Sequence, residues 1–288
     1  MVNKDSITNT FQVAGALCVV CSLMVSATAI GLRETQQNNV VLDKKKNILQ
    51  VAGFSAEEVK AMDAAKIESF FARGDQDAEK DNGNEIEISD IVVDLTTGDT
   101  ITEEQLKEKI SQDTVISSYD QEKQAKKVKE GLAVNMDVSL IGLKEHERFS
   151  HVYIVRNRKK DEISRYVFPV KGKGLWSTLF GYIAVDASFQ QIEGLTFYKH
   201  AETPGLGGEV DNPKWKKLWE GRMIYDEAGD LAKEYVVKGT TPADNPNAVD
   251  GLSGATITSK GVSNLVRFWL SDEGFGKFME QATENSSK

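Results

Sequence analysis

The chain has 288 residues, a formal net charge of −9 and a pI of about 5.1. This length is enough to bury a sizeable core in one or two domains, and the acidity argues against nucleic acid as a partner. The two cysteines, Cys18 and Cys21, lie in one apolar run, and the three histidines, His146, His151 and His200, lack metal-ligand spacing. The sequence therefore excludes a disulfide framework and predicts no metal site.

The first predicted element is a transmembrane helix over residues 11–32. This run contains no charged residue, and as a helix it would extend roughly 33 Å, enough to cross a bilayer. A cleaved signal peptide is the alternative, because Ala27-Thr28-Ala29 has the small side chains of a cleavage site. The length of the run, and a preceding segment in which Lys4 is offset by Asp5, favour an uncleaved anchor.

The charges beside this helix bear on its orientation. Arg33 and the run 44–46 follow the helix, whereas Lys4 alone precedes it. A count of positive charges would keep the C-terminal side in the cytoplasm. Long domains are translocated largely regardless of charge, so this count does not decide the orientation.

The portion over residues 33–133 mixes helices with one strand. Ser55 and Glu58 form a capping box that predicts a helix to about Ala72, and an acidic surface loop follows at 74–84. The remaining predictions are a strand at 85–95, a turn at 97–99, and helices at 103–110 and 121–130.

Strands dominate from residue 134 onward. Five runs rich in apolar residues are predicted as strands, and the last two form a hairpin across 186–191. Pro213 is suited to the first turn of a short helix that follows. Strands without regular alternation with helices indicate an α+β domain with a mainly antiparallel sheet flanked by helices. The predicted strands are 138–143, 152–156, 163–170, 180–185 and 192–198.

A short run of small residues feeds the last predicted helix. It reads Asp250-Gly251-Leu252-Ser253-Gly254-Ala255-Thr256. Apolar residues at helical spacing follow, so Thr258 or Ser259 is expected to be the N-cap. The simplest interpretation is a glycine-rich entry to a helix.

A functional interpretation is also open for this run. Gly254 and Ala255 leave the hydroxyl of Thr256 unshielded, so that a bulky donor could reach it. A phosphate attached to Thr256 would lie near a helix N-terminus, where anions are favoured.

Two earlier stretches could surround a planar ligand. Trp176, in the stretch 171–176, is either a core residue or an apolar wall with a polar edge. In the stretch 200–209, Pro204-Gly205 predicts a type II turn, and glycines there would let the backbone approach a flat ring. His200 is either a strand-end residue with satisfied hydrogen bonds or a proton donor.

Taken in order, the Gly-Leu-Trp, Glu-Thr-Pro-Gly-Leu-Gly and Ser-Gly-Ala-Thr stretches resemble the FMN-binding domain family. The resemblance implies that a flavin transferase moves FMN from FAD onto Thr256 as a phosphoester, with Asp250 in the element that the transferase recognises. It places the FMN-binding domain at 134–288. The other implied cofactor-binding residues are Ser253, Gly254, Ala255, Trp176, Glu202, Thr203, Gly205, Leu206 and Gly207.

Beyond these stretches, the N-terminal anchor and the Asn-Pro-Lys-Trp helix resemble the C subunits of sodium-translocating NADH:quinone oxidoreductases, and the resemblance is weakest over residues 35–130. This implies a single-pass inner-membrane protein with residues 1–10 in the cytoplasm and 33–288 in the periplasm. It would relay electrons towards ubiquinone, with the other subunits as partners, while the complex exports Na⁺ to the periplasm. NADH is not expected to bind this chain, because no dinucleotide-binding fingerprint follows a strand.

Two alternatives stay open on the sequence. An Rnf-type, ferredoxin-linked electron-transport subunit would share the flavin motif. A secreted, non-redox binding module would use the same loop only as a helix cap.

Overall fold

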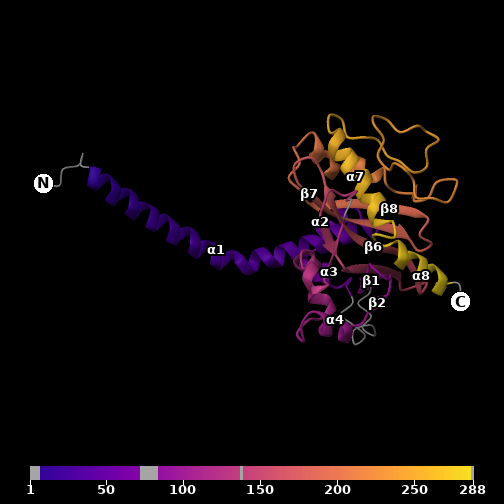
Figure 1. Cartoon of the computed structure of the whole chain (residues 1–288), viewed down its shortest axis with the longest axis horizontal. Helices are drawn as coiled ribbons and strands as arrows, with labels where there is room; N and C mark the ends of the chain where they lie inside the picture. The colour runs from indigo at the N-terminus through magenta and orange to yellow at the C-terminus, as the bar shows by residue number, and fades with distance from the viewer. Residues whose placement is uncertain (1–6, 72–83, 137–138, 287–288) are drawn as a thin grey trace. The chain divides into compact units, whose positions relative to one another are not determined.

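The computed structural model describes residues 7–71, 84–136 and 139–286 of the chain (Figure 1). The chain divides into two compact units, with the division between Lys44 and Lys45. Nearly all of the acidic loop predicted at 74–84 lies outside the described residues.

Helix α1 (Ile7–Val51) contains the predicted transmembrane segment 11–32 and continues well beyond it. Within the described residues, it is the one helix that is long and apolar enough to cross a membrane, judged by length and composition. Its large apolar side chains before Leu32 are exposed, as suits contact with lipid. The hydroxyl of Thr28 donates to the carbonyl of Met24 at 2.8 Å, so this polar group is satisfied within the helix.

The second unit is built on a seven-stranded sheet in the order β2-β1-β5-β6-β7-β8-β9, in which all neighbours are antiparallel. A separate hairpin pairs β3 with β4. The predicted α+β class with a mainly antiparallel sheet is confirmed. The strands are β1 (Ile86–Asp94), β2 (Thr100–Ile101), β3 (Ala133–Asn135), β4 (Glu145–Glu147), β5 (Phe149–Asn157), β6 (Glu162–Lys173), β7 (Thr178–Asp186), β8 (Gln191–Lys199) and β9 (Arg222–Met223).

Helices surround this sheet. The α-helices of the second unit, beside the end of α1, are α2 (Ala56–Ala61), α3 (Ala64–Glu68), α4 (Glu103–Lys109), α5 (Gln121–Gln124), α6 (Pro213–Lys217), α7 (Thr256–Trp269) and α8 (Gly276–Ser286). Short 3-10 turns lie at η1 (Ile116–Ser118), η2 (Val128–Glu130) and η3 (Gly207–Asp211). Asn212 caps α6 and Pro213 occupies its first turn, as predicted.

The C-terminal helices α7 and α8, yellow in Figure 1, pack with β6 in the main core. Helix α7 approaches β6 closely, because a side-chain carbon added at Gly261 would lie 2.3 Å from the Lys173 carbonyl oxygen. Farther along α7, the indole of Trp269 donates to the Lys171 carbonyl at 2.8 Å. These contacts fix α7, and therefore its N-terminus, on the sheet.

The last turns of α1 belong to the second unit and are buried in it. The hydroxyl of Thr196 on β8 donates to Asn47 at 3.1 Å, and Val51 lies against Gly194 of the same strand. Thr196 and Gly194 alternate along β8 with the core residue Leu195, so this contact is on the sheet face opposite α7.

Three predicted elements differ from the structure. The strand at 138–143 is wrong for the described residues 139–143, which form a turn because the Ser139 hydroxyl accepts from the Leu143 N–H at 2.9 Å. The helix from Ser55 has its capping box but stops at Met62, where Asp63 caps the separate helix α3.

The third difference is the helix predicted over 121–130. It stops after Gln124, and a 3-10 turn replaces its second half. Lys127 interrupts the helical backbone at φ −94° and ψ 56°, and Gly131 ends the turn in the left-handed region.

Candidate functional site

Thr256 is the first residue of α7, and its side chain is exposed. Ala255 occupies the N-cap position and supplies no side-chain hydrogen bond to the helix. The predicted N-cap at Thr258 or Ser259 is therefore wrong, since both residues lie inside the first turn of α7.

Both of these hydroxyls are buried because they bond to other segments. Thr258 is 1% exposed and donates to the Glu202 carboxylate at 2.7 Å. Ser259 is 6% exposed and accepts from the Leu252 N–H at 2.9 Å. Of the three hydroxyls at the start of α7, only that of Thr256 lies on an exposed side chain.

The loop before Thr256 is compact. Gly254 has a φ of +69°, a conformation that favours glycine, and a side-chain carbon there would lie 2.9 Å from Leu206. Ala255 is buried, whereas Ser253 is exposed. The Leu206 side chain therefore lies directly against the loop that carries Thr256.

The predicted type II turn is present at 203–206. Leu206 N–H donates to the Thr203 carbonyl at 3.1 Å, and Gly205 has a φ of +76°. A second bond joins Gly208 N–H to the same carbonyl at 2.9 Å. Thr203 and Leu206 are exposed, while Gly207 is buried beneath them.

Glu202 points inward from this turn and joins three segments of the chain. Its side chain accepts five hydrogen bonds although the residue is only 5% exposed. Two come from Thr258 on α7 at 2.7 Å and from the hydroxyl of Ser177 at 3.2 Å. The backbone N–H groups of Leu175, Trp176 and Ser177 donate the rest at 3.2, 3.0 and 3.0 Å.

These donors determine the protonation of Glu202. Burial raises the pKa of its carboxyl, but the bonds from Thr258 and from the backbone of Trp176, Ser177 and Leu175 lower it further than burial raises it. The pKa is therefore below its ordinary value, and the carboxylate is ionised at neutral pH.

Two glycines leave room for this carboxylate. A side-chain carbon at Gly174 would lie 2.6 Å from Glu202 Oε1. One at Gly207 would lie 2.7 Å from both Glu202 Oε2 and Thr258 Oγ1. The sequence suggested that glycines in this turn admit a flat ligand, but Gly207 accommodates the Glu202–Thr258 contact.

Trp176 is not a core residue, because 70% of it is exposed. Leu175, Leu206 and Ile257 are exposed by 47%, 43% and 58%. The hydrogen bonds of Glu202 and the Leu206–Gly254 contact hold the segments that carry these four side chains together beside Thr256. We call Leu175, Trp176, Leu206 and Ile257 the apolar collar.

Both ring nitrogens of His200 have partners. Nε2 lies 2.7 Å from Asp211 Oδ2, and Nδ1 accepts from the Glu202 N–H at 3.2 Å. His200 thus supports the backbone of Glu202 at the end of β8.

The structure brings the three stretches together at Glu202 and the start of α7, whereas the side chain of Asp250 accepts from the Thr241 N–H at 2.7 Å. Sequence reasoning missed Ser177, which donates to Glu202 and also accepts from the Ala201 N–H at 2.8 Å. No pattern in the sequence singles out this serine. It also missed Thr258 as a partner of Glu202.

The arrangement fits a flat aromatic group that ends in a phosphate. The apolar collar offers contact to a ring, and the α7 N-terminus, which lacks a side-chain cap, favours an anion at Thr256. Among the described residues, no cluster of His, Cys, Asp or Glu could hold a metal ion.

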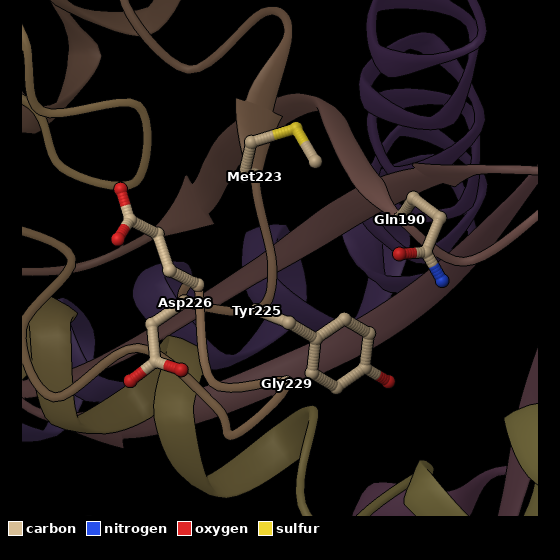
Figure 2. A pocket seen from close by; sticks show the side chains of 6 residues that line it. Gln190, Met223, Tyr225, Asp226 and Gly229 are labelled. Atoms are coloured by element: carbon tan, nitrogen blue, oxygen red, sulfur yellow. The ribbon is translucent and has the colours of Figure 1, made fainter.

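A hollow of about 400 Å³ lies elsewhere, at the β8–β9 end of the sheet. Figure 2 shows Gln190, Met223 and Tyr225 around it. Asp226 also lines it, but this carboxylate accepts the N–H groups of Ala228 and Asp230 within its own turn. The hollow shares no residue with the three motif stretches.

Comparisons with known proteins bear on the family to which the chain belongs. Residues 174–271 match the FMN-binding domain family. The C subunit of the Na(+)-translocating NADH-quinone reductase of Pseudomonas aeruginosa is 39% identical over 287 residues, covering 97% of this chain and 97% of that protein. Its counterpart in Yersinia pestis is 34% identical over 291 residues, covering 99% of this chain and 97% of that protein.

Among solved structures, that of Shewanella oneidensis NqrC aligns with a TM-score of 0.67 and 26% identity, covering 83% of this chain and 96% of that one. The chain therefore belongs to the family of C subunits of Na(+)-translocating NADH-quinone reductases and contains an FMN-binding domain.

Proposed function

We propose that this chain is the membrane-anchored flavoprotein subunit of a sodium-pumping NADH:quinone oxidoreductase, and that FMN is attached to Thr256 through a phosphoester. The observation that supports this most directly is the exposed hydroxyl of Thr256 at the first residue of α7. It stands at the end of the Ser-Gly-Ala-Thr motif and beside the apolar collar. The names of the relatives support the assignment to the complex.

Attachment would form one bond and break another. The Thr256 oxygen would bond to the phosphorus of the FMN half of FAD, the pyrophosphate bond would break, and AMP would leave. The hydroxyl proton would pass to a base on the flavin transferase. Bound there, FMN would supply the electron-carrying chemistry, and the protein would supply position and electrostatics.

The chain's own residues then have distinct tasks. Leu206 and Trp176 would cover apolar surface of the ring and exclude water from it. Glu202, which is buried under the collar, would hold their two segments and α7 in register through its five hydrogen bonds. The macrodipole of α7 would stabilise the phosphate at Thr256.

We further propose that α1 anchors the chain in the bacterial inner membrane, with the C-terminal domain in the periplasm. The exposed apolar surface of α1 supports the anchor, and the resemblance to the C subunits supports the orientation. The other subunits would be the electron-transfer partners, and the complex would export Na⁺ to the periplasm. An Rnf-type role is less well supported, because the two relatives compared above carry the quinone reductase name.

The test is intact-mass spectrometry and in-gel fluorescence of denatured protein after co-expression with a flavin transferase. Wild type should carry one FMN-phosphoryl adduct, and Thr256→Ala should be folded, inserted in the membrane and free of adduct. Thr258→Ala should keep the adduct. An adduct on Thr258 or Ser259, or one that persists in Thr256→Ala, would overturn the assignment.

A further inference from the structure

Asp250, the first residue of the flavin-attachment motif, has its side chain bonded within the protein. Its Oδ1 accepts from the Thr241 N–H at 2.7 Å, and the residue is half-buried. Its backbone carbonyl accepts from the indole of the buried Trp215 at 2.8 Å. Both acceptor groups of Asp250 therefore face the chain's own segments.

The neighbouring residues are bonded to the same segment. Val249 N–H donates to the Tyr235 carbonyl at 3.0 Å, and Val237 N–H donates back to Val249 at 3.1 Å. Gly251 N–H donates to the Gly239 carbonyl at 2.8 Å. The loop before Thr256 is thus aligned along residues 235–241, and the Asp250 side chain extends this alignment as far as Thr241.

Gly251 shows how close the two segments are. A side-chain carbon at this position would lie 2.4 Å from the Val237 carbonyl oxygen. The glycine after Asp250 is therefore required for the close approach of the segments, whether or not a second protein contacts it.

A short run of hydrogen-bonded residues connects Asp250 to Thr256, the proposed site of FMN attachment. Leu252 is buried, and its N–H donates to Ser259 on α7. Its carbonyl accepts from Ala255 N–H at 3.1 Å. The segment 250–256 is consequently fixed at one end by Asp250 and at the other by α7. Loss of the Asp250–Thr241 bond would leave the backbone bonds of Gly251 and Leu252 in place but would loosen the loop that presents Thr256.

We propose that Asp250 is a positioning residue for Thr256, which acts through the Thr241 N–H and not through a charge contact with the flavin transferase. The inference rests on the proposed attachment of FMN at Thr256. The carboxylate accepts from a neutral N–H group, so an amide oxygen of the same shape can accept the same hydrogen bond, although a charged acceptor makes it stronger. A neutral substitution therefore distinguishes positioning through the Thr241 N–H from recognition of the charge by the flavin transferase.

The experiment uses the full chain purified in detergent and incubated with flavin transferase, FAD and Mg²⁺. Asp250→Asn keeps an oxygen that can accept from Thr241 and removes the charge, whereas Asp250→Ala removes both. The initial rate of adduct formation is measured by intact mass. Hydrogen exchange over 239–256 is measured on the same samples before flavin is added.

We expect Asp250→Asn to label at close to the wild-type rate, with unchanged exchange in the loop. Asp250→Ala should label about tenfold more slowly, as expected for loss of a hydrogen bond to a charged group, and should exchange faster at Thr241. Thr241→Pro removes the donor and leaves Asp250 intact, so it should label as slowly as Asp250→Ala. The mass spectrum also verifies that the Asn–Gly pair created by the first variant has not deamidated.

The opposite pattern would overturn the proposal. If the transferase reads the charge of Asp250, then Asp250→Asn will fail as severely as Asp250→Ala while the loop exchanges like wild type. Thr241→Pro, if it folds, will label normally. Wild-type protein that takes up no FMN would instead contradict the proposed function, so the two failures are distinguishable.

Discussion

Among single residues, Glu202 has the densest set of hydrogen bonds at the site. One ionised carboxylate joins the segment 175–177, the turn at 203–206 and the first turn of α7. A carboxylate can accept all five bonds because it has no proton of its own. An amide cannot, because its NH₂ group would face a donor.

Glu202→Gln should therefore lower the free energy of unfolding by about 2 kcal/mol or more. The difference from wild type should depend on pH. The pKa of Glu202 is lowered in the folded chain, so its contribution is fully present above the unfolded pKa of about 4.3 and is lost as the pH falls through the folded value. Urea unfolding between pH 7 and pH 3 measures this, and a difference that stays constant over the range would contradict it.

Thr258 offers a second test of the same contact. Thr258→Ala should cost about 1.5–3 kcal/mol, because it removes a hydrogen bond to an ionised, buried partner. Thr258→Ser keeps the hydroxyl and is the matched control, with most of the stability retained. Equal thermal midpoints for the two variants would show that the hydroxyl has no such role.

The sequence was a better guide to which residues gather at the candidate site than to the role of each residue there. Thr256, Leu206 and Trp176 were placed by motif, and all three are exposed where a ligand could reach them. The inward direction of Glu202 could not be predicted, because its donors come from positions 25 to 27 residues before it and 56 residues after it. Such a contact exists only once the sheet and α7 have come together.

At the scale of elements, different factors prevent the two glycines of the turn from being replaced by residues with side chains. Gly207 is limited by space, whereas Gly205 has no atom within 4 Å of an added side-chain carbon and is limited by its φ of +76°. The same substitution should therefore act differently at the two positions.

Gly205→Ala should cost about 1 kcal/mol, the strain of a left-handed conformation for a residue with a side chain. Gly207→Ala should cost more and should also disturb Glu202, since the new carbon would displace the Thr258 contact. Thermal unfolding with hydrogen exchange of the Trp176 amide tests both. Protection of that amide should fall in Gly207→Ala and persist in Gly205→Ala, and the reverse order would refute this account.

Most strands were predicted well, and so was the type II turn at 203–206, but the turn at 139–143 was missed. The runs 152–156, 163–170, 180–185 and 192–198 all lie within observed strands, because alternation of apolar residues reports burial on a sheet directly. The failure at 139–143 came from one hydroxyl, that of Ser139, which closes a turn that the apolar pattern does not reveal. The predicted portions 33–133 and 134–288 share one sheet, in which β1 pairs with β5 along nine residues.

At the scale of the whole molecule, the division into units suggests where the chain can be cut. Residues from Lys45 onward form one compact unit, which includes the buried end of α1 with Ile48, Leu49 and Val51. A cut before Lys45 removes the apolar segment and keeps these core residues.

A protein that begins at residue 45 should be soluble without detergent and should unfold cooperatively. One that begins at residue 53 should be several kcal/mol less stable, because it loses three buried aliphatic side chains, each worth about 2 kcal/mol. Circular dichroism with urea titration compares them directly. Equal midpoints would show that the end of α1 is not part of the core.

The burial of Thr258 and Ser259 also bears on the fidelity of cofactor attachment. In an unfolded chain, the three hydroxyls at 256, 258 and 259 are nearly equivalent in chemistry and lie within four positions of one another. Folding withdraws two of them, so a single product would not require the modifying enzyme to distinguish among three similar alcohols. A single adduct at Thr256 would then report that a copy was folded when it was loaded, whereas loading of unfolded copies would give a mixture of products.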